Sequence, residues 1–289
     1  MLAALLAATV LTSAPEVLFR FADPVIAESS ALVAAPDGGG VWTAGDSGDP
    51  GRWFDVDRQG RTRAVHPLRG VVPVDVEDGA LGPTGALVLA DIGDNAARRR
   101  SVALHETRPG GATRTTVLRY ADGPHDAEAL LLHPRTGQTL VVTKELLGAR
   151  AYEARDGVLE PVAPVAVRAT GTPGGPAPNQ AAQLLVTGGA VSPDGRRLAL
   201  RTYTDAYVYE VPGDDLVAAL RSEPRVLPLP ATPQGEAVTW TRDRSALLTS
   251  SEGVRAPVHR VPVPGPPAAA APPPSSPGQV PDGLGAPLA

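Results

Sequence analysis

Residues 126–131 read DAEALL, and four other short stretches share its pattern of an alanine followed by leucine or valine. They are ESSALV (28–33), EDGALG (77–82), TGGAVS (187–192) and QGEAVT (234–239). Successive alanines lie 49, 49, 61 and 47 residues apart, a regular spacing with one longer interval. Self-similarity at such a period is typical of chains built from one repeated supersecondary unit. Five copies of one unit are therefore expected.

Each copy is expected to contain four β-strands. After the alanine comes a turn such as SPDG (192–195), then an apolar run such as LALRTY (198–203) and a third run such as AYVYEV (206–211). A further run, such as PRVLPLPA (224–231), precedes the next alanine. Runs rich in β-branched and aromatic residues between Gly, Pro and Asp turns predict strands. Four strands repeated about every 50 residues are typical of a propeller blade.

The sequence thus predicts an all-β, five-bladed β-propeller. The opening segment EVLFRFADP (16–24) resembles the fourth strands but precedes the first repeat. It is expected to pair with the last blade and close the ring, which leaves no unpaired edge. A six-bladed ring with an extra blade from residues 155–186 is the alternative. The one helix expected is short, within DDLVAALRS (214–222).

Residues 15–263 are expected to form the propeller, with a different segment on either side. Residues 1–14, MLAALLAATVLTSA, resemble a signal peptide, although a positively charged start is missing. Residues 264–289 are almost wholly Pro, Ala, Gly and Ser, which predicts a disordered tail. We therefore expect a secreted protein, extracellular or associated with the cell wall. No other apolar stretch is long enough to span a membrane.

Composition excludes several classes of function. The net charge is −5 and no broad basic stripe exists, which argues against nucleic-acid binding. Cysteine is absent, which excludes disulfides, thiolate catalysis and zinc–sulfur sites. The remaining partners are small molecules, glycans or components of the cell envelope, and we expect a monomer.

Polar residues of the repeats are expected to gather at one mouth of the central channel. The first strand of a blade begins at the face where the antiparallel second strand ends. Three positions before the alanines stand Glu28, Glu77, Asp126, Thr187 and Gln234, and directly before them stand Ser30, Gly79, Glu128, Gly189 and Glu236. The second strands end at Asp46, Asp91, Lys144, Arg201 and residues 250–252. This register predicts an acidic mouth with one lysine and one arginine.

Such a mouth has two chemical interpretations and one structural one. Carboxylates can hold a hard cation, so Ca²⁺ is the expected cofactor, with Asp46, Asp91, Asp94 and Asn95 as ligands in the turns DSGD (46–49) and DIGDN (91–95). Crowded carboxyl groups can instead do acid–base work, because crowding raises the pKa of one while its neighbour stays ionised. In the structural interpretation the carboxylates bind backbone amides of the next blade.

Lys144, in VVTKE (141–145), is the only lysine of the chain. A compact ammonium forms ion pairs of flexible geometry, which the planar guanidinium of arginine does less well. Its place at the end of a second strand, facing the acidic mouth, makes it a candidate site residue. An ion pair with Glu128 or Glu145 is the structural alternative.

The segments VEDGAL, LADIGDN, DAEALLL, VVTKE, SPDGRRLALRTYTDA and QGEAVTW…SSEG occur in that order over about residues 16–264. In these segments the chain resembles exported bacterial propellers grouped as phytase-like or esterase-like. The resemblance implies a secreted propeller with an acidic, Ca²⁺-dependent face. The chain departs from β-propeller phytases in having fewer blades and few basic residues, with Lys144, Arg201 and Arg98 as the candidates.

Three functions compete on these observations. In a metal-assisted hydrolase of phosphate or carboxylic esters, Ca²⁺ would polarise the ester or its attacking water, and Lys144 and Arg201 would neutralise developing negative charge. A glycosidase-like enzyme would use Glu77, Glu128 and Glu236 from separate blades. A non-catalytic binding module of the cell envelope would use the same mouth to hold a ligand.

Overall fold

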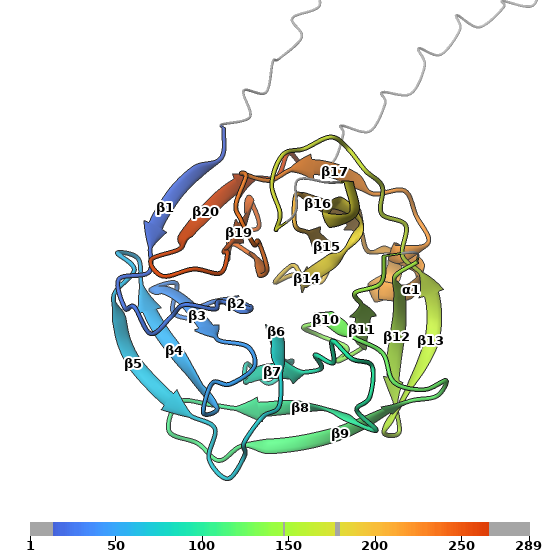
Figure 1. Ribbon diagram of the computed structural model, residues 1–289, viewed down its shortest axis with the longest axis horizontal. Helices are drawn as coiled ribbons and strands as arrows, with labels where there is room; N and C mark the ends of the chain where they lie inside the picture. Colours follow the sequence, from blue (N-terminus) through green and yellow to red (C-terminus); the bar gives the residue numbers. More distant parts are fainter. Residues whose placement is uncertain (1–13, 147, 177–179, 266–289) are drawn as a thin grey trace, which may run out of the picture.

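The regular structure consists of antiparallel strands arranged around a centre (Figure 1). The computed structural model describes residues 14–146, 148–176 and 180–265. The predicted signal peptide (1–14) and tail (264–289) lie almost entirely outside the described residues. Among the described residues, no helix is long and apolar enough to cross a membrane.

The strands form three four-stranded sheets and one sheet of eight strands. We call each set of four consecutive strands a unit, numbered along the chain. Unit 1 contains β2 (Ala31–Ala34), β3 (Gly40–Ala44), β4 (Arg52–Asp57) and β5 (Thr62–Pro67). Unit 2 contains β6 (Val76–Leu81), β7 (Leu87–Asp91), β8 (Val102–Thr107) and β9 (Arg114–Tyr120). Unit 3 contains β10 (Ala127–Leu132), β11 (Thr139–Thr143), β12 (Arg150–Arg155) and β13 (Val158–Pro164).

The remaining strands complete the ring. Unit 4 contains β14 (Val186–Val191), β15 (Arg197–Thr202), β16 (Asp205–Glu210) and β17 (Arg225–Pro228). Unit 5 contains β18 (Val238–Trp240), β19 (Ala246–Thr249), β20 (Pro257–Pro262) and β1 (Glu16–Arg20). The first strands β2, β6, β10, β14 and β18 pack against one another in that cyclic order around the centre. This confirms the prediction of an all-β propeller.

The N-terminal strand completes the last sheet, as the sequence predicts. β1 pairs antiparallel with β20 from Glu16↔Arg260 to Arg20↔Pro257. Phe19 and Phe21 follow on this strand, pack edge to face, and are buried with residues of units 1 and 5. β1 thus joins the start and the end of the chain through both a strand ladder and a shared core.

Units 2 and 3 are continuous with each other. Their outermost strands, β13 and β9, pair in parallel at Val158↔Arg119 and Leu159↔Tyr120, which makes the eight-stranded sheet. Elsewhere the neighbouring units meet through apolar clusters such as that of Leu131, Val142 and Leu200.

The alternative of an extra blade from residues 155–186 is wrong. β13 belongs to unit 3, and the described residues between β13 and β14 form only the 3₁₀ helix η1 (Gln180–Leu184). The predicted helix is present as α1 (Leu216–Leu220), following the 3₁₀ turn η2 (Pro212–Asp214). Its N-cap is Asp215, whose side chain accepts hydrogen bonds from the N–H groups of Val217 and Ala218.

Ring closure can be tested at Phe21, whose side chain is fully buried between units 1 and 5. Phe21→Ala should lower the free energy of unfolding by about 3–5 kcal/mol, because it leaves a cavity at the closure. The measurement is the urea unfolding midpoint. Val17→Ala on the same strand, where the side chain is 50% exposed, should change the stability by less than about 0.5 kcal/mol. Equal effects of the two substitutions would contradict this account of closure.

Candidate functional site

Five residues at equivalent positions of the first strands define the centre of the acidic mouth. In each unit a backbone N–H closes the turn after the first strand, and these donors are Ala35, Gly82, His133, Ser192 and Thr241. Five residues before them stand Ser30, Glu77, Glu128, Thr187 and Glu236. We call these five residues the ring. In units 2, 3 and 4 the ring residue is the extra residue of a β-bulge.

The alignment on alanine was therefore wrong by two residues in units 2 and 4. Ala80 and Ala190 lie three residues after the ring position, whereas Ala31, Ala129 and Ala237 lie one residue after it. The sequence register put Glu77 and Glu128 at different positions, but the structure makes them equivalents. Side chains of a strand alternate with a period of two, so a shift of two residues leaves the apolar pattern unchanged and the sequence did not reveal it.

The three glutamates of the ring are buried close together. Glu77, Glu128 and Glu236 have 7%, 3% and 4% of their surface exposed. Burial raises the pKa of Glu77 to about 11; the charges of Glu128, Asp75 and Glu236 add to this, and Lys144 opposes it. Burial also raises the pKa of Glu128 and of Glu236, whose carboxyl groups are in hydrogen-bonding contact with each other. Such a group of acids stays partly protonated unless a cation compensates it.

Lys144 is the cation that this cluster contains. Its ammonium forms an ion pair with Oε1 of Glu128, and Nζ lies 5.3 Å from the centre of the Tyr203 ring. Burial alone would lower the pKa of Lys144, but the charges of Glu128 and Glu236 outweigh it and raise the pKa above its ordinary value. Lys144 is thus a charged residue of the mouth, and it is also the predicted structural partner of Glu128.

Two ring oxygens lack a hydrogen-bond partner although they are buried. With the carboxyl groups ionised, Oε2 of Glu128 receives no hydrogen bond, and the hydroxyl of Ser30 makes none. Ser30 is 1% exposed. The hydroxyl of Thr187, in contrast, donates to the carbonyl of Gly235 at 2.9 Å. Buried polar atoms without partners are uncommon in native structures and call for an explanation.

Arg201 lies beneath the ring and is bound to backbone. It is 1% exposed, and its Nη1 donates to the carbonyls of Ala237 at 2.6 Å and Ser250 at 2.7 Å. A side chain at Gly235 would collide with this guanidinium, since an added Cβ would lie 1.9 Å from it. Burial lowers the pKa of Arg201 to about 10, against the charge of Glu236. In this position Arg201 joins units 4 and 5 and has little access to a substrate.

The predicted calcium ligands of the turn 91–95 differ in how their oxygens are occupied. Both oxygens of Asp91 are occupied, by the backbone N–H groups of Val74 and Asp75, by His105 at 3.2 Å and by Arg99 at 2.8 Å. Burial opposes these donors, but together they lower the pKa of Asp91. Asp94 accepts from the N–H of Arg99 at 2.6 Å, and Asn95 is exposed.

Asp91 is therefore engaged by protein donors in this conformation, and the Ca²⁺ ligand set of Asp46, Asp91, Asp94 and Asn95 stays a prediction. As they stand, no three His, Cys, Asp or Glu side chains in the described part of the chain are arranged to hold a metal. Asp46, the fourth predicted ligand, belongs to another group of acids. Burial raises its pKa to about 7, together with a hydrogen bond to Glu28 and the charges of Glu28, Glu252 and Asp75.

Asp46, Glu28 and Glu252 form a rim around the buried glutamates. Burial raises the pKa of Glu252 to about 7, with the charges of Glu236 and Glu28 adding to it. Gln234 donates to Glu252 at 2.6 Å. A cavity of about 230 Å³ opens beside Glu28, and its lining also includes Asp49 and Arg52. The mouth therefore has buried acids at its centre and, at its edge, Asp46 and Glu252, whose pKa values are raised to about 7.

The sequence reasoning missed two members of the mouth. These are Asp75, which is buried beside Glu77 and hydrogen-bonds with it, and Tyr203, which lies against Lys144. A third, unpredicted feature is that the hydroxyl of the expected residue Ser30 has no hydrogen-bond partner among the described residues. Asp75 and Tyr203 stand two residues from predicted positions, at strand ends whose side-chain directions depend on the bulges. His125, which precedes β10, is held between Asp122 at 3.0 Å and Glu145 at 2.9 Å.

Comparison with known proteins gives likeness of fold only. No protein-family model matches the chain, and no curated protein matches it in sequence. A gluconolactonase from Xanthomonas campestris shares 15% identity over 78% of this chain and 68% of that one, with a TM-score of 0.44. The β-propeller domain of Cps50 (Swd1) from Myceliophteria thermophila shares 14% identity over 82% and 84%, with a TM-score of 0.43. U3-55K shares 11% sequence identity over 86% of this chain and 98% of its own, with a TM-score of 0.45.

One of these solved structures is an enzyme, and at such low identities they do not decide between the possible functions of this chain. The resemblance to phytase-like and esterase-like propellers stays a prediction.

The Lys144–Glu128 pair can be tested by a double-mutant cycle. Lys144→Met leaves a buried carboxylate without its partner, which should cost about 3 kcal/mol of unfolding free energy at pH 9. The cost should be smaller at pH 5, because Glu128 can then take up a proton. The double variant Lys144→Met with Glu128→Gln removes both charges and should recover at least half of the loss. Additive effects of the two substitutions would show that the pair is not coupled.

Proposed function

We propose that this chain is a five-bladed β-propeller whose acidic mouth binds Ca²⁺ through the ring and hydrolyses an ester or phosphoester there. The observation that carries the proposal is the ring itself. Five equivalent positions supply three carboxyl groups and two hydroxyl groups from five units, and two of their buried oxygens have no partner. Hard oxygen donors of this kind are the ligands that Ca²⁺ takes in proteins.

The proposal includes a rearrangement of the ring. Since no three acidic side chains are arranged as metal ligands as they stand among the described residues, the carboxyl groups would exchange their protons for the cation and turn toward it. The raised pKa values of Glu77, Glu128 and Glu236 describe the same site in its protonated form. A bound cation would supply Lewis acidity toward an ester oxygen or water.

The residues of the chain then have separate parts in hydrolysis. Asp46 and Glu252, with pKa values of about 7 at the half-exposed rim, are suited to accept and return a proton near neutral pH. Lys144 places a fixed positive charge beside the ring, where it would stabilise negative charge on a reacting ester. The cavity next to Glu28 offers space for the substrate at the rim.

The glycosidase alternative is less well supported by this geometry. Retaining and inverting glycosidases hold their two carboxyl groups about 5–9.5 Å apart, with the scissile bond between them. Glu128 and Glu236 are instead in hydrogen-bonding contact with each other. Export of the protein, and a glycan or envelope ligand in place of an ester, stay predictions from the sequence.

Cation binding can be tested by thermal unfolding at pH 8. A hundredfold excess of Ca²⁺ over its Kd should raise the Tm of the protein by roughly 5–10 °C. Glu77→Gln and Glu128→Gln should each remove most of this rise, because each removes a charged oxygen ligand. Glu160→Gln, an exposed substitution on β13, should retain it. A Tm that does not respond to Ca²⁺, with Mg²⁺ and Mn²⁺ equally inactive, would overturn the cation site.

Hydrolysis is tested separately with p-nitrophenyl phosphate and p-nitrophenyl acetate in the presence of Ca²⁺. Turnover that falls at least tenfold in Asp46→Asn and Lys144→Met would support the reaction, since a lost catalytic proton transfer or fixed charge costs that much or more. Stabilisation by Ca²⁺ without turnover of either ester would instead favour the non-catalytic binding module.

The acids of the mouth also predict how stability depends on pH. The pKa values of Asp46 and Glu252 are about 7 in the folded protein, above their ordinary values, so the folded state binds more protons than the unfolded chain. The contribution of these two groups to stability in the absence of Ca²⁺ should therefore be greatest below about pH 4 and should be lost progressively as the pH rises to about 7. Glu77, with a pKa of about 11, extends this loss to higher pH.

Replacement of Glu77 by Gln should reduce this loss, because the neutral amide imposes no charge on the cluster. Tm measured from pH 5 to pH 9 in EDTA should fall less for Glu77→Gln than for the unmodified protein. A Tm that rises with pH in the unmodified protein would contradict the assignment of the mouth as proton-rich.

A further inference from the structure

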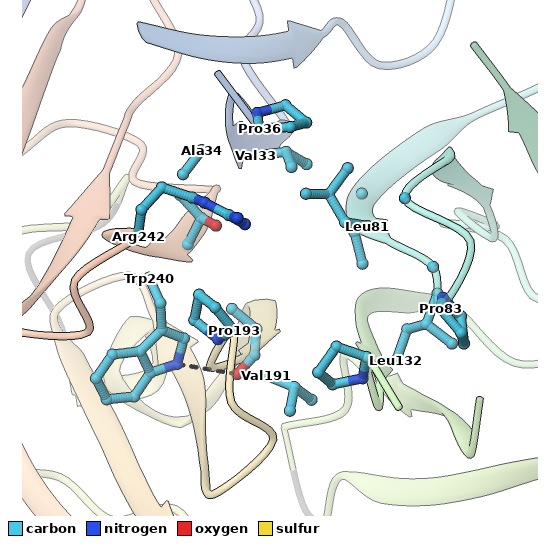
Figure 2. A pocket seen from close by; sticks show the side chains of 17 residues that line it. Val33, Ala34, Pro36, Leu81, Pro83, Leu132, Val191, Pro193, Trp240 and Arg242 are labelled. Atoms are coloured by element: carbon cyan, nitrogen blue, oxygen red, sulfur yellow. Dashed lines mark hydrogen bonds between the residues drawn. The ribbon is translucent and has the colours of Figure 1, made fainter. Parts of the chain in front are cut away.

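The opposite end of the channel has a different chemical character. The residue after each turn donor is Pro36 in unit 1, Pro83 in unit 2, Pro134 in unit 3, Pro193 in unit 4 and Arg242 in unit 5. Four prolines and one arginine thus occupy equivalent positions around the axis. Figure 2 shows Pro36, Pro83, Pro193 and Arg242 around a common opening, and Pro134 lines the same cavity. We call this opening the proline mouth.

The proline mouth leads into an apolar cavity of about 220 Å³. Its walls include Val33, Leu81, Leu132, Val191 and Trp240, and apart from Thr239 and Arg242 its lining side chains are apolar or glycine. The indole N–H of Trp240 is already donated to the carbonyl of Ala190 at 3.3 Å. A dry apolar cavity of about 150 Å³ accommodates benzene, so this cavity has space for an aromatic ring with a short substituent.

Arg242 is the only charged group of the cavity lining. Its guanidinium reaches toward the middle of the opening in Figure 2. Among the described residues Arg242 makes no ion pair or side-chain hydrogen bond, whereas other arginines of this face are engaged. Arg244 of the same turn is paired with Asp194 at 2.7 Å, and Arg135, next to Pro134, is paired with Asp214. Arg242 is thus left free to bind an anion.

We propose that the proline mouth binds a small amphipathic monocarboxylate, with its carboxylate on Arg242 and its apolar body in the cavity. A carboxylate has two oxygens that one guanidinium can bind with two parallel hydrogen bonds. A phosphate or sulfate has more oxygens than one arginine can satisfy, and apolar walls would leave the others without donors. An aryl or short alkyl group fills the remaining space and gains from leaving water.

This site is independent of the proposed reaction. It lies at the end of the channel away from the acidic mouth, where the carboxylates would repel an anion. Along β6, Glu77 belongs to the acidic mouth while Gly79 and Ala80 line the cavity. Failure of Ca²⁺ binding or of hydrolysis would therefore leave the proposal untouched.

The test is calorimetric titration of the full chain with sodium phenylacetate. The Kd for phenylacetate should lie below about 10 mM. Phenylacetamide, the neutral analogue of the same shape, should bind at least about tenfold more weakly. Sodium phosphate should not compete. Arg242→Gln should lower the affinity for phenylacetate to that for phenylacetamide. Arg98 is an exposed arginine in the loop that carries DIGDN, and Arg98→Gln should leave the affinity for phenylacetate unchanged.

A second variant tests the cavity without changing the charge. Ala80→Leu places three extra carbons into the cavity and should abolish phenylacetate binding, and an unchanged cooperative thermal transition would show that the variant is folded. The proposal is overturned if phenylacetate fails to bind, if phenylacetamide binds equally well, or if Arg242→Gln retains the affinity of the unmodified protein.

Discussion

The carboxylate of Asp78 joins three units of the propeller at the centre of the molecule. One of its oxygens accepts from the N–H of Gly79, and the other accepts from Leu130 of β10 at 2.7 Å and Gly189 of β14 at 3.0 Å. It is fully buried, and burial raises its pKa well above the ordinary value despite these three donors. Asp78 follows the ring residue Glu77 and precedes Gly79, so it separates the acidic mouth from the apolar cavity. Both proposed sites depend on this interaction, because it fixes the strands that line them.

The two ends of the channel differ because the same repeat places different residue types at its two turns. At one end the strand bulges direct acids toward the axis, with one lysine against three buried glutamates. At the other end the turns supply prolines, which expose no N–H and present apolar rings. An uncompensated group of acids lowers the stability of a fold, so its presence at one end is expected where binding or catalysis requires it. The apolar end does not lower the stability of the fold in this way, and its single unpaired charge among the described residues, Arg242, is exposed.

The sequence was sufficient for the strands, the order of the units, the closing N-terminal segment and the location of the acidic mouth. These follow from strand periodicity and from turn residues, which are local properties. It was insufficient for the register of the ring in units 2 and 4, because a shift of two residues keeps every side chain on the same face of the strand and leaves the apolar pattern unchanged. It was also insufficient for Asp91, whose partners Arg99 and His105 come from later segments. Whether an acid is free or occupied depends on such distant partners.

The parallel pairing of β13 with β9 makes one junction between units of the propeller different from the others. Among the described residues, no other two consecutive units share a strand ladder, so units 2 and 3 form one continuous sheet while the other junctions rest on packing and on side-chain bridges. Glu77 of unit 2 and Glu128 and Lys144 of unit 3 thus belong to one hydrogen-bonded sheet, whereas Glu236 precedes the first strand of unit 5, in a separate sheet. The acidic mouth is therefore assembled from two frameworks, and the contact between Glu128 and Glu236 joins one framework to the other.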